Sequence, residues 1–265
     1  MSRILLLGGT TEAGALAQAL AGAGIAAVYS YAGAVAAPRS QPLPVRVGGF
    51  GGIAGLCAYC RAEGIGAIID ATHPFAAQMS NHAVAAAAAL GLPLAALERP
   101  PWQPVAGDRW IGVASMAEAA QHLVGRRVFL GIGRNELAAF GGGDGAQAGS
   151  GPRARRFLLR LVDPPQSPPL ANADWVVARG PFTLAGDLAL LRAHDITCIV
   201  SKNAGGSGAY AKIEAARALS LPVVMVARPQ IAPRLSFATV AGVMGWLAQG
   251  AALGAAHNAG QLRGV

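Results

Sequence analysis

The stretch RILLLGGTTEAGALAQALA, residues 3–21, decides the fold of this chain. Ile4 to Leu7 is a short apolar run typical of a buried strand, and Gly8-Gly9 ends it at once. The alanine-rich run from Glu12 to Ala21 then predicts a helix. A strand, a glycine loop and a helix in this order indicate the first βα unit of a parallel sheet.

The glycine loop, Gly8 to Glu12, has two interpretations, and the residues leave both open. As a pyrophosphate cradle, it offers close backbone approach at the glycines, the hydroxyls of Thr10 and Thr11, and the free amides of a helix N-terminus. As a tight turn, it uses Thr10 or Thr11 only to cap the helix. The GxGxxG fingerprint is incomplete, because Thr10 and Ala13 stand at its other two glycine positions.

The same alternation of short apolar runs and alanine-rich segments continues along the chain, with one interruption. Arg99 to Pro104 contains three prolines, which continue neither a strand nor a helix. We therefore expect an α/β protein of two Rossmann-like domains, each with a doubly wound, mostly parallel sheet, and a cleft between them. The expected domains are residues 1–105 and 106–250, followed by a tail at 251–265.

Composition narrows the class of protein. The chain has 265 residues and a net charge of +8, but its arginines are scattered, so we expect no nucleic-acid partner. Its first apolar run is too short for a signal peptide, which favours a cytoplasmic protein. The uncharged stretch from Leu235 to Ala256 is diluted by glycines, which favours a packed C-terminal helix over a membrane span. Cys57 and Cys60 form an isolated CxxC without a second ligand pair, so we expect no metal and a packing role. The oligomeric state is open, with a monomer favoured.

The end of the second expected strand bears on the cofactor. An NAD-binding domain usually has an acidic residue there for the ribose diol, but this chain has Ser30-Tyr31 and no acid between Glu12 and Glu63. Arg39 lies nearby in the sequence. If a dinucleotide binds to the first domain, the residues favour NADP(H).

Further candidate residues follow other strands, where ligands of doubly wound sheets bind. His73, in Asp70 to Phe75, follows a buried strand, and its alternative is a polar residue in a helix-capping turn. Gly131 to Glu136 is a competing dinucleotide loop with Arg134 at its tip. Arg179 occupies a similar strand end in the second domain.

The only two lysines of the chain, Lys202 and Lys212, lie in SKNAGGSGAYAK, residues 201–212. This loop is not a P-loop, because Ala211 precedes Lys212 and Ile213 follows it. It follows a predicted strand, so Lys202 is expected at the mouth of a ligand site and Lys212 one turn into the next helix. Both are also compatible with solvated surface charges.

Together these segments resemble the precorrin-6A reductase family of cobalamin biosynthesis. The matching motifs are GGTTEAGALA, VRVGGFGG, DATHPFAA, LERPPW, GIGRNEL, ARGPF, SKNAGGSGAYAKIEAAR and LPVVMVARP. They cover residues 3 to about 229, and DATHPFA and SKNxGG are the most specific. The resemblance implies reduction of a ring double bond of precorrin-6A by NADPH, giving precorrin-6B, with the tetrapyrrole in the interdomain cleft.

The resemblance also assigns roles to individual positions. It places the following residues on the NADPH side: Gly9, Thr10, Thr11, Glu12, Ser30, Gly48, Gly49, Thr72 and His73. Gly8, in the same glycine loop, is expected to bind the cofactor with them. It places the following residues toward the substrate: Arg134, Arg179, Gly180, Lys202, Asn203, Gly205, Gly206 and, by charge, Lys212. Arg39 is a less certain contact for the 2′-phosphate, since Ala32-Gly33-Ala34 stands where the family usually has AGR.

Hydride transfer to a conjugated ring also requires a proton. Lys202, His73 and Tyr210 are candidate donors, and water is an equal alternative. A short-chain type of reductase is disfavoured, because Tyr210 and Lys212 are too close for a Tyr-x-x-x-Lys pair. The alternative from another class is a noncatalytic nucleotide-binding α/β protein that uses its basic surface.

Overall fold

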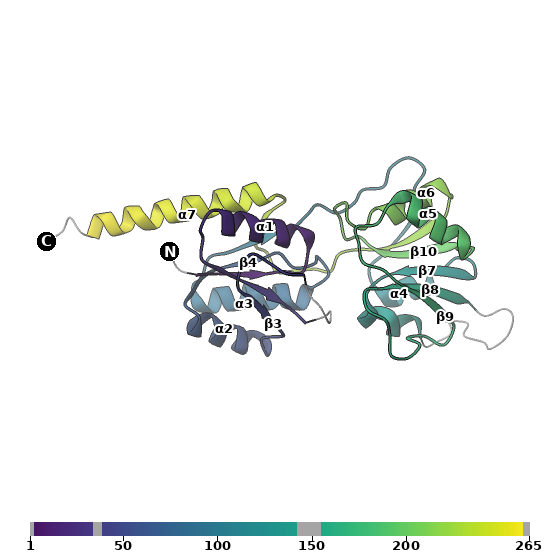
Figure 1. Ribbon diagram of the computed structural model, residues 1–265, viewed down its shortest axis with the longest axis horizontal. Helices are drawn as coiled ribbons and strands as arrows, with labels where there is room; N and C mark the ends of the chain where they lie inside the picture. The colour runs from purple at the N-terminus through teal and green to yellow at the C-terminus, as the bar shows by residue number, and fades with distance from the viewer. Residues whose placement is uncertain (1–2, 34–38, 142–154, 262–265) are drawn as a thin grey trace. The chain divides into compact units, whose positions relative to one another are not determined.

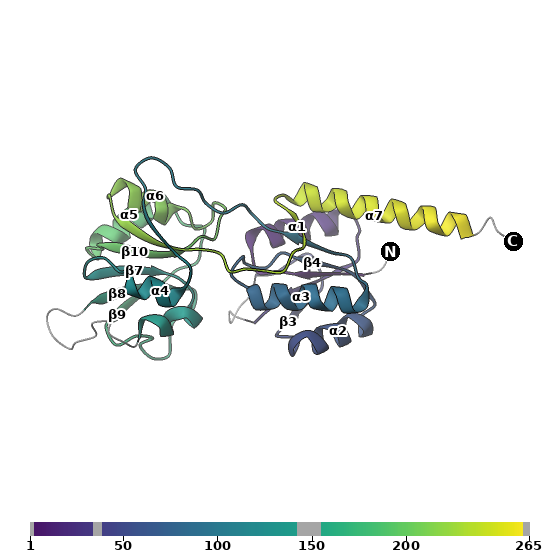
Figure 2. The ribbon, with the colours of Figure 1, turned by 180° about the vertical axis from the view of Figure 1, so that it is seen from behind.

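The computed structural model describes residues 3–33, 39–141 and 155–261, with side chains as far as residue 250. The chain divides into two compact units. Unit 1 runs to Pro100 and resumes at Gln230, and unit 2 is Pro101–Pro229. Each unit holds a six-stranded parallel sheet with helices on both faces (Figures 1 and 2). The predicted α/β fold with two Rossmann-like sheets is confirmed.

Unit 1 has the strand order of a dinucleotide-binding fold. Its strands are β1 (Arg3–Leu7), β2 (Ala27–Tyr31), β3 (Val45–Val47), β4 (Ile65–Asp70), β5 (Leu94–Leu97) and β12 (Leu235–Phe237). Its helices are α1 (Thr11–Gly22), α2 (Gly52–Ala62), α3 (Ala77–Leu90) and α7 (Val240–Gln261). The strands lie in the order β12-β5-β4-β1-β2-β3, so the direction of winding reverses between β1 and β4. Ligands of such sheets bind at the carboxyl ends beside this reversal.

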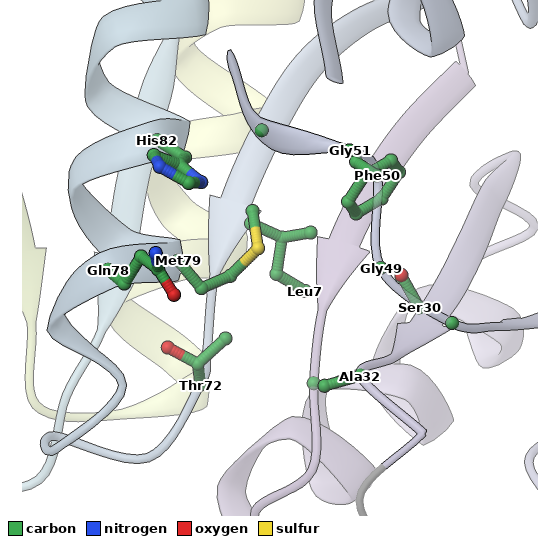
Figure 3. Close-up of a pocket in the computed structure, with 13 residues that line it drawn as sticks. Leu7, Ser30, Ala32, Gly49, Phe50, Gly51, Thr72, Gln78, Met79 and His82 are labelled. Carbon is green, nitrogen blue, oxygen red and sulfur yellow. The ribbon is translucent and has the colours of Figure 1, made fainter. Parts of the chain in front are cut away.

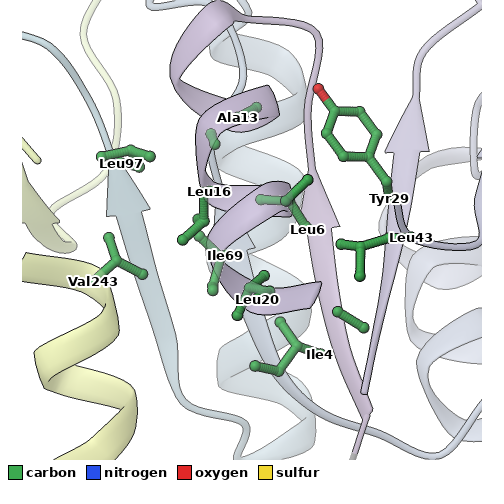
Figure 4. Close-up of a cluster of buried hydrophobic side chains, with 13 residues drawn as sticks. Ile4, Leu6, Ala13, Leu16, Leu20, Tyr29, Leu43, Ile69, Leu97 and Val243 are labelled. Atoms are coloured by element: carbon green, nitrogen blue, oxygen red, sulfur yellow. The ribbon is translucent and has the colours of Figure 1, made fainter. Parts of the chain in front are cut away.

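Strand β1 is apolar throughout because both of its faces are covered. Ile4 and Leu6 pack in a cluster with residues of α1 and α7, which Figure 4 shows. Leu5 and Leu7 pack on the other face with residues of α2 and α3. Successive side chains of a strand point to opposite faces, so one uninterrupted apolar run serves both layers.

The C-terminal boundary predicted from the sequence is wrong. Residues from Gln230 belong to unit 1, not to a second domain that runs to residue 250. β12 pairs with β5 at the edge of the first sheet, and Val243 of α7 is fully buried in the cluster that contains Leu97. The edge strand and helix cover apolar surface of unit 1, which would otherwise meet water. The backbone of α7 continues through most of the expected tail, and residues 262–265 lie outside the described part.

Unit 2 has a similar six-stranded parallel sheet. Its strands are β6 (Arg109–Val113), β7 (Arg127–Gly131), β8 (Arg156–Leu161), β9 (Ala173–Val177), β10 (Cys198–Lys202) and β11 (Pro222–Val226). Its helices are α4 (Met116–Gln121), the 3₁₀ helix η1 (Arg134–Phe140), α5 (Leu184–Ala193) and α6 (Ala211–Ala218). The order is β6-β11-β10-β7-β8-β9, which puts the reversal between β7 and β10. Lys202 is the last residue of β10, and Arg134 is the first residue of η1, which follows β7.

The sequence left two further features open. Cys57 and Cys60 are buried in the cluster between α2, α3 and the sheet, where they pack as small apolar side chains. Among the helices of the described residues, none combines the length and the apolar character needed to cross a membrane.

Candidate active site

The glycine loop of unit 1 is shaped by Tyr29 of the neighbouring strand. A Cβ at Gly8 would lie 2.1 Å from the Tyr29 ring, so this position has no room for a side chain. Gly9 has a φ of 120°, which favours glycine, and its N–H donates to the Tyr29 hydroxyl at 2.8 Å. Burial raises the pKa of Tyr29, so the hydroxyl keeps its proton.

Thr10 caps the helix that follows the loop. Its hydroxyl oxygen accepts from the Ala13 N–H at 3.0 Å, and the hydroxyl donates to the Ala71 carbonyl at 2.9 Å. The capping interpretation is therefore correct, and it leaves the cradle possible. The N–H groups of Thr11 and Glu12 belong to the first turn of α1, which has no intrahelical acceptor for them. The Glu12 carboxylate pairs with Arg99 at 2.6 Å.

A cavity of about 380 Å³ opens beside the carboxyl ends of β1, β2, β3 and β4. Figure 3 shows Gln78, Met79 and His82 projecting from α3 on one side, opposite Ser30 and Phe50. Five of the predicted cofactor residues line it: Gly8, Ser30, Gly48, Gly49 and Thr72. Phe50 and the three residues of α3 were not predicted from the sequence. Gln78 and His82 are one helical turn apart, a spacing that puts them on one face.

Arg46 is a further residue that was not predicted from the sequence. It donates to the Ser30 hydroxyl at 3.1 Å and to the carbonyls of Gly48 and Gly49 at 2.7 and 2.9 Å. Its guanidinium lies 3.8 Å from the centre of the Phe50 ring. These contacts hold a positive charge among residues that line the cavity.

Among the predicted cofactor residues that do not line the cavity, Arg39 and His73 make contacts of other kinds. Arg39 is exposed, and its carbonyl accepts from the Tyr31 hydroxyl at 2.9 Å. His73 forms a local turn in which its Nδ1 accepts from the Phe75 N–H at 3.2 Å. The histidine that lines the cavity is His82.

A buried ionic network supports the floor of the cavity. Thr72 donates its hydroxyl to Asp70 at 2.7 Å, and the other Asp70 oxygen lies 3.4 Å from Arg234. Arg234 also pairs with Glu98 at 2.9 Å. Since Arg234 directly precedes β12, the last strand of the sheet is tied to the strand beside the cavity.

The carboxyl edge of the unit 2 sheet gathers three predicted substrate residues: Arg134, Arg179 and Lys202. Arg134 donates to the carbonyls of Asp163 and Pro164 at 3.1 and 3.4 Å. Arg179 lies 3.9 Å from the Asp163 carboxylate. Lys202 pairs with Glu136 in the first turn of η1. The edge is therefore cationic, with acidic residues interspersed.

Asn203 has a structural role beside that edge. Its amide oxygen accepts from the Trp102 N–H at 2.7 Å, and its amide nitrogen donates to the Trp102 carbonyl at 3.0 Å. The following loop turns through Gly205 and Gly206, whose φ angles are 69° and 68°. Gly206 accepts from the Trp102 indole at 2.7 Å. Gly180 packs near this loop, where a Cβ would lie 3.3 Å from the Gly208 carbonyl.

Two other candidates, Lys212 and Tyr210, are held by contacts within unit 2. Lys212 is only 5% exposed, donates to the Ala209 carbonyl at 2.7 Å and lies 5.0 Å from a Trp102 ring. Burial lowers the pKa of Lys212 to about 7, with Arg160 adding to the effect. The sequence allowed Lys212 either to contact the substrate or to be a solvated surface charge. A side chain that is this deeply buried fits neither role. The Tyr210 hydroxyl accepts from Arg217 at 2.9 Å.

The fold defines a two-unit α/β protein in which each unit has a doubly wound parallel sheet. A family model described as Precorrin-6x reductase CbiJ/CobK matches residues 3–248. The precorrin-6A reductase of Rhodobacter capsulatus is 54% identical over 94% of this chain and 96% of its own. That of Rhodococcus erythropolis is 46% identical over 93% of this chain and 98% of its own. A solved structure of CobK precorrin-6A reductase has a TM-score of 0.84 at 53% identity, covering 94% of this chain and 97% of that one. The chain belongs to the precorrin-6x reductase CbiJ/CobK family, whose members are oxidoreductases.

Proposed function

We propose that this chain reduces one ring double bond of precorrin-6A to give precorrin-6B in cobalamin biosynthesis, with NADPH as the reductant. Family membership over nearly the whole chain carries the proposal. The strand-end sites of the two units support it, because both suit anionic ligands.

Unit 1 suits the cofactor. The Gly8-Gly9 loop and the N-terminus of α1 would hold the pyrophosphate. The Tyr29 ring leaves no room for a side chain at Gly8, so a ligand can approach the backbone closely. The cavity beside Ser30, Phe50 and Met79 would hold the adenosine end. Gln78 and His82 offer hydrogen-bonding groups to the base in that cavity.

NADPH fits better than NADH at the end of β2. Among the described residues, none that lines the cavity is acidic and could bind a ribose diol, and Ser30 is bonded to the cationic Arg46. A 2′-phosphate beside Ser30 would therefore meet a guanidinium, which binds phosphate strongly. Arg46 replaces Arg39 as the proposed contact, because Arg46 is held among the lining residues.

Unit 2 suits the substrate, whose rim carries acetate and propionate groups. Arg134, Arg179 and Lys202 are cations on one sheet edge, and we assign them to these carboxylates. NADPH supplies a hydride when bound. The residues of this chain bind and orient the two ligands, and Lys202 is the residue at the edge that can also deliver a proton, with water as the alternative donor. His73 and Tyr210 fit that role less well, since both are held in local contacts.

The test is an anaerobic assay with purified protein, precorrin-6A and either NADPH or NADH. We expect NADPH absorbance to fall only when both substrate and protein are present, with a product heavier by a hydride and a proton. NADH should give little turnover. Binding of NADPH without turnover of precorrin-6A would instead support the noncatalytic nucleotide-binding alternative.

A further inference from the structure

Lys202 ends β10, one of the two strands at which the winding of the unit 2 sheet reverses. Its side chain is only 17% exposed, so most of its length is covered. Its neighbour Ser201 is in register with Gly131, the last residue of β7. The loop after β7 leads directly into η1, and Glu136 in η1 pairs with Lys202.

Glu136 is itself fixed by the backbone. One carboxylate oxygen, Oε2, accepts from the Gly133 N–H at 3.1 Å, and the other, Oε1, pairs with the Lys202 ammonium. A lysine has a flexible four-carbon chain and a point charge, so a rigid carboxylate is an effective way to fix where that charge sits. Arg134, in contrast, is held by two backbone carbonyls.

We propose that Glu136 is a positioning residue of the reductase: it holds the Lys202 ammonium in the orientation that the reaction uses. The inference rests on the proposed function, and in particular on the contact of Lys202 with precorrin-6A. It assigns a role to the acidic residue of GIGRNEL, which is otherwise only the cap of a short helix.

Two other roles for Glu136 predict different kinetics. A residue that only caps η1 would affect stability, and its removal would harm the enzyme whether or not Lys202 is present. A residue whose charge only repels the anionic substrate would, on removal, lower the KM for precorrin-6A in either background. A positioning residue acts only through Lys202, so its effect must vanish when Lys202 is removed.

A double-mutant cycle separates these roles. Glu136→Gln keeps an oxygen for the Gly133 N–H but loses the charge that pairs with Lys202. We expect it to lower kcat/KM for precorrin-6A about tenfold, mainly through kcat, with unchanged unfolding temperature. In a Lys202→Met background the same substitution should change kcat/KM less than about twofold. Asp163→Asn is the matched control, because Asp163 pairs with Arg179 instead, and its effect should persist beside Lys202→Met.

Equal losses from Glu136→Gln in both backgrounds, a lower KM in both, or wild-type kinetics in the single variant would each overturn the positioning role. These outcomes leave the proposed reduction intact. If the wild type itself consumed no NADPH with precorrin-6A, the proposed function would fail, and the positioning role with it. If Lys202→Met were as active as the wild type, reduction would stand but both Lys202 and Glu136 would lose their roles.

Discussion

The Tyr29 hydroxyl accepts a hydrogen bond from the backbone N–H of Gly9, across the start of the loop that joins β1 to α1. The aromatic ring lies directly under Gly8. Tyr29 of β2 thus sets the path of the Gly8-Gly9 backbone, which we propose binds the pyrophosphate. The contact couples β2 to the loop between β1 and α1.

Gly8→Ala should therefore impair both stability and cofactor binding. Its Cβ would collide with the Tyr29 ring, and overpacking of this kind costs about 1–3 kcal/mol of unfolding free energy. Gly14→Ala is the control, because its Cβ would meet only a Gln41 atom at 3.9 Å, and alanine is the better helix former. Thermal unfolding and NADPH titration measure both effects. Equal behaviour of the two variants would contradict the account of the loop.

Arg46→Met should reduce the preference for NADPH. Loss of a guanidinium beside the proposed 2′-phosphate is expected to weaken NADPH binding about tenfold and to leave NADH binding unchanged. Arg39→Met, at the exposed residue predicted from the sequence, should change neither. Fluorescence titration with both nucleotides checks this. If Arg39→Met weakened NADPH binding selectively and Arg46→Met did not, Arg39 would be the contact for the 2′-phosphate.

Arg134→Gln and Arg179→Gln should raise the KM for precorrin-6A several-fold, with a smaller change in kcat. Both remove a cation at the carboxyl edge of the sheet, where we place the substrate carboxylates. Arg156→Gln is the matched control, since Arg156 begins β8 at the opposite end and pairs with Asp174. Steady-state kinetics at two salt concentrations measure the effect, and a similar rise in the Arg156 variant would argue for a general charge effect.

Lys212 should make stability depend on pH. Its pKa is about 7 in the folded protein against 10.5 for an ordinary lysine, so the unfolded chain binds more protons between these values. For this group, stability therefore rises with pH across that window. Lys212→Met removes the contribution, so the difference in unfolding temperature between variant and wild type should shift in favour of the wild type from pH about 7 to pH about 10. A difference that stays constant with pH would show that Lys212 is not buried in its neutral form.

Asn203→Ala should lower the free energy of unfolding rather than raise the KM for precorrin-6A. The Asn203 amide makes two hydrogen bonds to the Trp102 backbone, and their loss should cost about 2 kcal/mol of unfolding free energy. Gln121→Ala, at an exposed position of α4, should be nearly neutral. Chemical denaturation compares them. An Asn203 variant of wild-type stability but raised KM would restore the substrate-binding role predicted from the sequence.

The fold could be predicted from the sequence because most of its strands and helices have a local pattern of apolar residues. The run from Ile4 to Leu7 indicated a strand covered on both faces, and the Gly8-Gly9 loop indicated the turn into α1. β12 was missed because its partner β5 is far away in the sequence, and three exposed or half-buried residues carry little pattern.

The candidate sites were predicted less completely, for a geometric reason. Strand ends could be located from the sequence, so Ser30 and Lys202 were expected there, and the family resemblance added Gly48. Which side chain turns toward a cavity depends on helix phase and packing, so Arg46 and His82 were missed. Burial depends on distant neighbours, and so Lys212 was taken for a charge near the surface.

The return of the chain to unit 1 after Pro229 has a consequence for synthesis. Strands β1 to β5 leave the ribosome first, but β12 and the helix that buries Val243 leave it last. Unit 1 therefore stays open along one edge until the whole of the inserted unit 2 has been translated. A nascent chain stalled within unit 2 would display that uncovered edge to chaperones and proteases, whereas unit 2 has all of its own strands before translation ends.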